Sequence, residues 1–457
     1  MTRRKRLLMK KSVAGTLAIF VMLAQVVTGF SASSFAAGTI PGSLTFQNTS
    51  LTRPEGDVEP AISIDADGTM AITGLQRLAP REVPTIFGMH YWSGPFGSTP
   101  AFRGLLDADL QRAGKTVIGS GDGDVDLGST GTLHATSLIF LINSPFNNDS
   151  VGVSAITCTD STASDCTSQI IDTAGADRQW ITSDGQHVYI AYHDAGFSAQ
   201  IHVQRSDNDG YTWRRAGNPI VGQGRTTGNA IFKNIAGPIV ADPLSHNVYN
   251  IYASASEAGL ERTSIDINNI LVSRSIDGGN SWTANLVYHA PLFTSLNDFP
   301  SLAVDPTNGR LYATWADPQS IFFSSSSDQG NHWSPAVKVN IAPANTCVLP
   351  WIAAYNGTVD VVYYATTASS KDDEAAVWNV YLAQTTNGGL TFAQSKVSNN
   401  PNHVGVVCTG GACPLSERAL WDLFEVAIDP QNGRAAVIYT DTNTGDPKAQ
   451  VVLATQN

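Results

Sequence analysis

Charged residues are scarce in this sequence, and basic ones most of all. Only 14% of the 457 residues are charged, and 27 Lys and Arg stand against 39 Asp and Glu, for a formal net charge of −12. The shortage of Lys and Glu argues against a long helical or coiled-coil protein, and 42% hydrophobic residues argue against a disordered chain. No basic stripe occurs past residue 11, so nucleic acid is not expected as a partner. A globular, β-rich chain remains.

The N-terminus concentrates the bases that the rest of the chain lacks. Six Lys and Arg precede residue 12, and an apolar run from Val13 to Phe30 follows. With small residues at Ala36 and Ala37, this pattern predicts a secretory signal peptide over 1–37 and a mature chain of 38–457. The run is also close to the length of a membrane span, so an uncleaved N-terminal anchor is the alternative. Cleavage removes the six bases and no acid, so the mature chain would be secreted with a net charge of −18.

Cysteine is rare as well, with 5 in the whole chain. In an oxidising compartment, cysteines favour disulfides over thiol chemistry. Cys158 and Cys166 bracket a short turn-like segment, and Cys408 and Cys413 enclose four residues, so both pairs are candidates for local disulfides. Cys347 is left over, either buried or competing for Cys408 or Cys413.

An eight-residue pattern recurs four times, at 206–213, 275–282, 326–333 and 385–392. Each copy follows one alternating apolar segment and precedes another, which predicts a hairpin turn between two strands. The Asp or Asn at the third position can accept hydrogen bonds from turn amides, and the Gly at the fifth can take a positive φ. The third positions are Asn208, Asp277, Asp328 and Asn387.

These turns resemble the Asp box, or BNR repeat, of sialidases and related β-propellers. The copy at Asp277 matches fully, the copy at Asp328 departs at His332, and the other two carry Asn at the acidic position, one of them ending in Phe392. The resemblance implies an all-β propeller whose boxes serve folding and lie on the face away from the ligand mouth.

A second, looser repeat indicates the number of blades. Seven segments combine an apolar run, a turn and a strand rich in Tyr, Val and Ala, beginning near Glu59, Asp124, Asp177, Ile235, Asp298, Leu349 and Leu423. About 60 residues per segment suits a four-stranded blade, so the sequence predicts a single seven-bladed β-propeller over 38–457. The six blades of a typical sialidase are the alternative, and they would leave one segment unassigned.

The last segment ends one strand short of a full blade. Residues 448–456 can form its third strand and nothing follows, while 43–47 has no blade of its own. We therefore expect the N-terminal segment to complete the seventh blade, which pairs a sheet edge that would otherwise be exposed.

In this topology the start of each inner strand lines the axial channel at the face opposite the Asp boxes. The residues placed there are Glu59, Asp122, Asp124, Asp177, Arg178, Trp180, Asp298, Trp351, Trp421 and Asp422. Carboxylates beside Trp faces are typical of sugar sites, since acids bond hydroxyls or protonate a glycosidic oxygen while indoles stack on the ring. We expect Asp124, Asp177, Asp298 and Asp422 as catalytic candidates, and Glu59, Arg178, Trp180, Trp351 and Trp421 as ligand-binding candidates.

The function expected is binding or hydrolysis of an extracellular glycan, and whether catalysis occurs is left open. A propeller that binds a protein partner without chemistry is one alternative. A true exo-sialidase is another, but such enzymes hold the sialic acid carboxylate with three arginines, and only Arg178, Arg225 and Arg418 are candidates here. Xyloglucanase-type Asp-box enzymes match the blade count yet carry two propellers.

The alternating acids of 122–126 raise the question of calcium. A calcium loop of the EF-hand type starting at Asp122 needs Gly at its sixth position and Glu at its twelfth, where Leu127 and Leu133 stand. No metal and no cofactor are therefore expected.

Overall fold

The computed structural model describes most of the chain that follows the N-terminal segment. The residues described are 43–51, 53–76, 88–113, 117–143, 148–194, 200–221, 234–255, 267–290, 298–409, 418–443 and 449–457. They belong to one compact unit, Ala37–Asn457, which is distinct from Met1–Ala36. The predicted signal peptide lies outside the described residues. None of the helices within them is long and apolar enough to cross a membrane.

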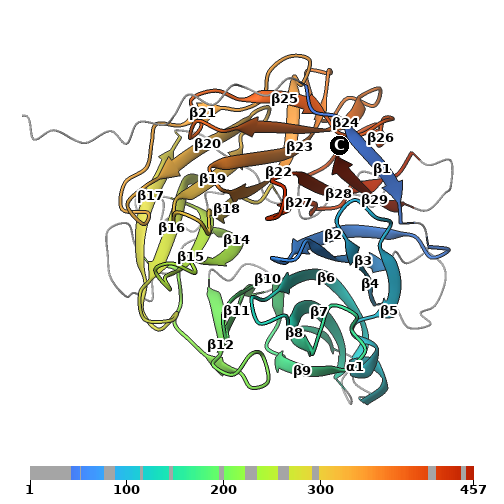
Figure 1. Cartoon of the computed structure of the whole chain (residues 1–457), viewed down its shortest axis with the longest axis vertical. Coiled ribbons are helices and arrows are strands. Elements are labelled where there is room, and N and C mark those ends of the chain that lie inside the picture. The colour runs from blue at the N-terminus through green and yellow to red at the C-terminus, as the bar shows by residue number, and fades with distance from the viewer. Residues whose placement is uncertain are drawn as a thin grey trace, which may run out of the picture. The chain divides into compact units, whose positions relative to one another are not determined.

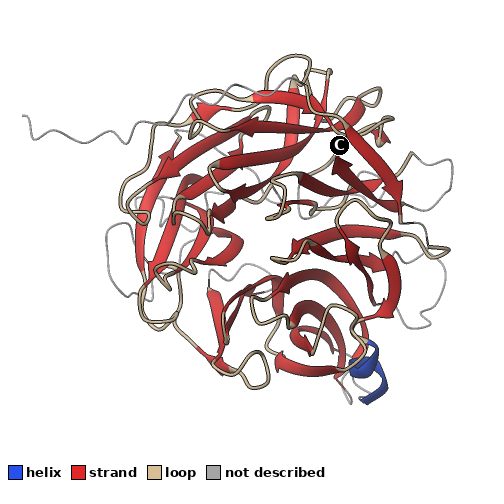
Figure 2. Ribbon diagram, viewed as in Figure 1, coloured by secondary structure: helices blue, strands red, loops and turns tan. Residues whose placement is uncertain are grey.

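The described residues form seven antiparallel sheets arranged in a ring, as Figures 1 and 2 show. The predicted seven-bladed propeller is therefore confirmed. The six-bladed alternative is wrong, because the strands form seven separate sheets. We call the strands of a blade A to D from the axis outwards. Strand order follows the chain in blades one to six, so each blade is a meander of adjacent hairpins.

The bounds of the first three blades are as follows. Blade one contains β2 (Asp57–Ile64), β3 (Thr69–Gln76), β4 (Met89–Pro95) and β5 (Ala101–Leu105), and the short helix α1 (Ala108–Ala113) follows it. Blade two contains β6 (Val117–Leu127), β7 (Leu133–Asn143), β8 (Asn148–Cys158) and β9 (Cys166–Asp172). Blade three contains β10 (Ala176–Asp184), β11 (His187–Asp194), β12 (Ile201–Ser206) and β13 (Arg214–Arg215).

The remaining blades complete the ring. Blade four contains β14 (Asn234–Ala241), β15 (Val248–Ala255), β16 (Ile267–Ser275) and β17 (Thr283–His289). Blade five contains β18 (Ser301–Val304), β19 (Leu311–Ala316), β20 (Ile321–Ser326) and β21 (Val337–Lys338). Blade six contains β22 (Thr346–Tyr355), β23 (Thr358–Thr366), β24 (Val377–Thr385) and β25 (Ala393–Lys396), with β26 (His403–Val404) also paired to β24. Blade seven contains β27 (Glu425–Ile428), β28 (Ala435–Asp441), β29 (Gln450–Gln456) and β1 (Phe46–Ser50).

Blade seven is closed by the N-terminal strand, as expected from its missing outer strand. β1 pairs antiparallel with β29, from Phe46 opposite Gln456 to Ser50 opposite Val452. In Figure 1 the blue β1 lies beside the dark red β29. The strand starts three residues later than the 43–47 segment singled out in the sequence. The ends of the chain thus share one sheet, and its outer edge is paired.

The core lies between neighbouring blades. Middle strands such as β23 are buried on both faces, which explains their near-continuous Val, Tyr and Ala runs rather than a strict alternation. Large side chains fill the wedge between sheets, and the fully buried tryptophans are Trp180, Trp282, Trp315 and Trp378. Burial of this kind holds the strand A segments, and hence the channel, in place.

The four repeated turns share one hydrogen-bond pattern. In the second copy the Asp277 carboxylate accepts from the Ser281 amide at 2.8 Å, and Ser275 Oγ accepts from the Gly279 amide at 2.8 Å. The equivalent third-position side chains at Asn208, Asp328 and Asn387 accept from the amide four residues on in the same way. The fifth-position glycine has a φ between 78° and 90° in the four turns, which favours glycine there.

These C–D turns lie on the same face as the A–B turns of neighbouring blades. Asp209 of the first copy contacts Thr132 Oγ1 in the A–B turn region of blade two, and Oδ1 lies 3.1 Å from His134 Nε2. The starts of the strands A therefore face the opposite side of the ring. This is the arrangement expected from the sequence.

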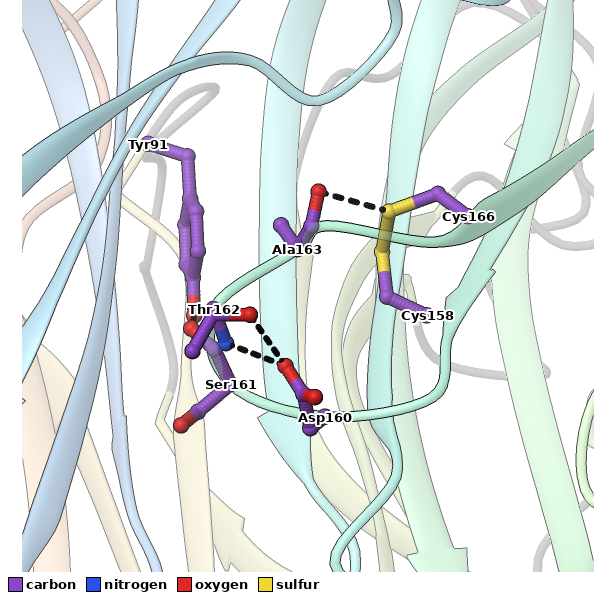
Figure 3. The surroundings of a disulfide bond; sticks show 7 residues. All are labelled: Tyr91, Cys158, Asp160, Ser161, Thr162, Ala163 and Cys166. Atoms are coloured by element: carbon purple, nitrogen blue, oxygen red, sulfur yellow. Dashed lines mark hydrogen bonds between the residues drawn. A yellow bond between two sulfur atoms is a disulfide. The ribbon is translucent and has the colours of Figure 1, made fainter.

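The predicted disulfide between Cys158 and Cys166 is present and joins the ends of β8 and β9 (Figure 3). Its loop is ordered by Asp160, which accepts from the Thr162 amide at 2.7 Å, and Tyr91 Oη of blade one donates to Ser161 O at 2.8 Å. Cys408 is also disulfide-bonded, and Cys413 lies outside the described residues. Cys347 is a free, buried thiol.

Candidate functional site

A bulge interrupts strand A near its start in five blades. The register shifts by one extra residue after Val58, Ser120, Asp177, Ala236 and Val348. At this point Glu59, Arg178 and Leu349 have φ values of 48°, 57° and 55°, a left-handed conformation that costs a non-glycine residue about 1 kcal/mol or more. Bulges redirect side chains, and here they redirect Glu59 and Arg178 into an ion cluster.

Arg178 is the centre of this cluster, which we call the mouth cluster: Glu59, Asp122, Asp177, Arg178, Arg418 and Asp422. Its guanidinium lies 3.1 Å from Asp122 Oδ2 and 3.7 Å from Glu59 Oε1, and it donates to Asp422 Oδ2. Arg418 donates to the same Asp422 oxygen. Side chains from blades one, two, three and seven thus meet around one cation at the end of the channel where the strands A begin.

Burial makes the electrostatics of the mouth cluster strong. Desolvation, with the neighbouring charges of Asp122 and Asp422, raises the pKa of Glu59 well above its ordinary value. Desolvation acts on Asp122 as well, but the charge of Arg178 outweighs it and lowers the pKa of Asp122. Desolvation and the charge of Asp122 raise the pKa of Asp177. The cluster therefore contains one carboxyl with a raised pKa, Glu59, and one with a lowered pKa, Asp122, both in contact with Arg178.

The remaining acidic candidates bond to main-chain amides of the next blade. Asp124 Oδ2 accepts from the Ile181 amide at 2.8 Å, and Asp298 Oδ1 accepts from the Leu349 amide at 2.5 Å. Glu425 Oε2 likewise accepts from the Ile62 amide at 2.8 Å. Inner strands present unpaired amides to the channel, so these carboxyls satisfy them and link neighbouring strands A.

Of the four catalytic candidates, the structure brings Asp177 and Asp422 together with Glu59 and Arg178. Asp124 lies further along the channel, where desolvation raises its pKa to about 7 despite amide bonds from Ile181 and Val125. Asp298 accepts a hydrogen bond from the Leu349 amide of the next blade, as described above. The roles assigned to these residues from the sequence stay predictions.

The three tryptophan candidates differ in exposure. Trp180 is 1% exposed, and the centroid of its ring lies 5.6 Å from that of Phe299 in an edge-to-face contact. Neither face of the indole is therefore open for stacking. Trp351 is partly buried beside the channel. Trp421 is partly exposed, with the Arg418 guanidinium 5.3 Å from its ring. Trp421 is thus the tryptophan candidate in direct contact with the mouth cluster.

Sequence reasoning missed one of these residues and undervalued two. Asp122 was placed at the mouth but given no catalytic or binding role, Arg418 was considered only among the arginines of a sialidase site, and Glu425 was not singled out. Glu425 had a signal, because it is a charged residue within the apolar segment 423–428 of the last blade. Within the described part of the chain, no group of three or more His, Cys, Asp and Glu is arranged to hold a metal ion.

Comparison with known proteins identifies the fold and not the family. No protein-family model and no curated protein matches the sequence. Among solved structures, an ulvan lyase of polysaccharide lyase family PL25, bound to a ligand containing glucuronic acid and rhamnose, is similar with a TM-score of 0.52 and 12% identity, covering 91% of this chain and 94% of the lyase. A Hadza microbial sialidase has a TM-score of 0.47 and 10% identity, covering 90% and 95%. A protein of unknown function from Dyadobacter fermentans has a TM-score of 0.45 and 14% identity, covering 72% and 97%.

Proposed function

We propose that this protein is a secreted, sialidase-like propeller that binds or cleaves extracellular carbohydrate at the mouth cluster. The four repeated turns are then Asp boxes with a folding role on the far face. A polysaccharide-active enzyme among the structures of similar fold is consistent with this proposal. A glycan is the partner proposed for the mouth.

The observation that carries the proposal is the pairing of Glu59 with Asp122 beside Arg178. Cleavage of a glycosidic bond requires a carboxyl that donates a proton and a second group that acts as a base or nucleophile. Burial and the neighbouring acids raise the pKa of Glu59, which suits a proton donor, while Arg178 lowers the pKa of Asp122, which suits the ionised partner. Glu59 is therefore the proposed proton donor, and Asp122 the group of opposite role.

A terminal sialic acid is not the proposed substrate. Both Arg178 and Arg418 are engaged by Asp422, and Arg225 lies outside the described residues. Tyr363 and Tyr364, the adjacent tyrosines of β23, are both fully buried rather than placed at the mouth. An acidic mouth favours neutral sugars over anionic ones, since like charges repel.

The test is a screen of the purified mature protein against a glycan array and a panel of chromogenic glycosides. If a glycoside is turned over, Glu59→Gln is expected to reduce turnover by roughly 10²-fold or more while substrate still binds. Asp277→Asn, on the far face, is the matched control and should leave turnover unchanged. If the protein binds without turnover, Glu59→Gln and Asp422→Asn should weaken glycan binding. Absence of both binding and turnover across the screen would overturn the proposal.

A further inference from the structure

The channel contains a cavity that the proposed function does not use. Its volume is about 420 Å³, and it is lined by strand A residues of all seven blades. The lining runs from Asp124 and Glu425 to the A–B turns, where Ser129 and Pro243 are exposed to solvent. The cavity therefore opens on the face of the repeated turns, opposite the mouth cluster.

The mouth and this cavity are separated by packed side chains. Between them lies a void of only about 10 Å³, lined by Phe299, Trp351, Asp422 and their neighbours. That void holds at most about one water molecule. Trp351 alone lines both spaces, so a ligand of the cavity does not reach Glu59 or Arg178.

The charges in the cavity have one sign. Its lining includes the carboxyls of Asp124, Asp126, Asp184 and Glu425, and it includes no Lys, Arg or His. Exposed His246 contacts Asp184 at the rim, at 2.7 Å, but does not line the cavity. Asp126 contacts Ser63 and Ser183 of the neighbouring blades. No basic side chain of the lining offsets these four acids.

Glu425 gives the second observation that points to a ligand. The side chain is 4% exposed, and one oxygen accepts from the Ile62 amide. Among the described residues, no hydrogen bond is made by its other oxygen, Oε1. Glu425 lines the cavity, so this oxygen is open to a hydrogen-bond donor there. A ligand in the cavity that carries such a donor, and a positive charge with it, would bond to this oxygen.

The rest of the lining determines the class of ligand. Most of it is aliphatic, with Ile and Val side chains from all around the ring and the aromatic rings of Trp351 and Tyr355. The volume lies within the range of about 300–1,000 Å³ that is typical of small-molecule sites. Aromatic rings attract organic cations, and aliphatic walls favour an apolar body.

We propose that this cavity binds a small organic cation, an ammonium group on an apolar body, with the ammonium at Glu425 and Asp124. The site goes beyond the proposed carbohydrate function and lies on the other face of the ring. Its occupant is identified by charge complementarity and by the unpartnered Glu425 oxygen. Occupation does not require that any glycan is bound or cleaved.

Benzylammonium is the probe, with benzyl alcohol and benzoate as neutral and anionic controls of the same size. Titration calorimetry and thermal unfolding of the purified mature protein are expected to show binding of benzylammonium, and little or none of the controls. A ligand that binds only the folded state raises the melting temperature with concentration. Equal responses to benzylammonium and benzyl alcohol, or no response to benzylammonium, would overturn the proposal.

Variants locate the site. Glu425→Gln keeps an acceptor for the Ile62 amide but cannot ionise beside an ammonium, and it is expected to weaken benzylammonium binding about tenfold or more. Asp360→Asn removes another buried carboxyl, one that does not line the cavity, and is the matched control. If Glu425→Gln does not fold, Ala427→Phe fills cavity volume while every acid of the lining is kept, and it should abolish binding. Unchanged affinity in either cavity variant contradicts the assignment.

Proton release supplies an independent measurement. Burial and the charge of Asp124 raise the pKa of Glu425 well above its ordinary value, which favours a proton on this carboxyl while the cavity is empty. An ammonium that ionises a cavity carboxyl displaces such a proton, and the heat of binding then depends on the ionisation enthalpy of the buffer. Identical heats in phosphate and in Tris would show that no cavity carboxyl engages the cation.

Discussion

At the scale of single residues, the carboxyls of this molecule differ widely in how many hydrogen bonds they accept. Asp277 accepts from the amide and hydroxyl of Ser281 and from Ser275 Oγ, and these bonds outweigh desolvation and lower its pKa. Asp360 is fully buried and has one partner, Gln384 Nε2 at 2.9 Å, while its Oδ2 has none within the described chain. The same residue type therefore stabilises a turn in one place and carries a proton in another.

The first prediction concerns Asp277. Asp277→Ala leaves the turn amides without an acceptor, and we expect the free energy of unfolding to fall by about 1–2 kcal/mol. Urea denaturation measures the change. Asp372→Ala is the control, because Asp372 is exposed and pairs only with Lys371, and its effect should stay below about 0.5 kcal/mol. Equal stabilities of the two variants would contradict the role given to the turn.

The second prediction concerns pH. Desolvation raises the pKa of Asp360 to about 7, against an unfolded value near 4. The folded state thus binds the proton more tightly, so the stability that this group contributes is present below about pH 4 and is lost as pH rises through 7. The Asp360→Asn variant has no carboxyl at this position, so its stability does not fall in this way as pH rises. Relative to the parent, it should gain stability between pH 4 and 7, by at most about 4 kcal/mol.

Denaturation curves of both proteins at several pH values measure that gain. A stability difference between Asp360→Asn and the parent that is constant from pH 4 to pH 7 would show that Asp360 titrates normally. Glu425→Gln should change the slope in the same direction, since burial raises the pKa of that carboxyl as well.

At the scale of elements, β1 is an N-terminal strand that completes a C-terminal sheet. Outside blade seven it also contacts blade six, where Asn48 Nδ2 donates to Val397 O at 3.0 Å. Tyr439 Oη of β28 donates to Asn48 Oδ1 at 3.0 Å. The strand is therefore fixed by side chains as well as by its ladder with β29.

The third prediction is that a mature chain beginning at Leu51 is less stable than one beginning at residue 38. Loss of β1 exposes the edge of β29, and an unpaired edge promotes association with other chains. We expect a melting temperature lower by several degrees, or aggregation detected by light scattering. Addition of a synthetic peptide covering residues 43–50 should restore part of the loss. An unchanged melting curve and a monodisperse short chain would refute the closure role.

Much of the element order could be predicted from the sequence, and for a physical reason. Repeated turns and apolar runs depend on local chemistry, so they revealed the blades and even the spare strand. The mouth cluster does not depend on local chemistry alone. Arg178 meets Asp422 across the channel because a bulge turns its side chain, and neither the bulge nor a partner 244 positions away leaves a pattern in a single sequence. Trp180 lies in the core for the same reason, since its register depends on that bulge.

At the scale of the whole molecule, one guanidinium connects four of the seven blades. Arg178 belongs to blade three and contacts acids of blades one, two and seven. Those acids are buried, and in the absence of a cation their mutual repulsion would act across the axis. Arg178 thus has a structural role in addition to any role in ligand binding.

The fourth prediction is that Arg178→Met destabilises the ring by roughly 3–5 kcal/mol at neutral pH, as expected when one partner of a buried ion pair is removed. The cost should shrink as pH falls, because protonation of Asp122, whose pKa Arg178 lowers in the parent, removes uncompensated negative charge. Combining it with Asp422→Asn should recover part of the loss, which a double-mutant cycle measures. Additive effects in that cycle would show that the two side chains act independently.

The shared sheet of blade seven has a consequence for the order of synthesis. Asn457, which directly follows β29, bonds to Thr45, which lies 412 positions earlier. At roughly 5–20 residues per second, β1 leaves the ribosome some 20–80 seconds before its partner strand exists. During that interval the ring has an open seam, and no arrangement of the first six blades can close it. Synthesis of β29, rather than completion of any one of those six blades, is therefore the event that makes the closed ring accessible.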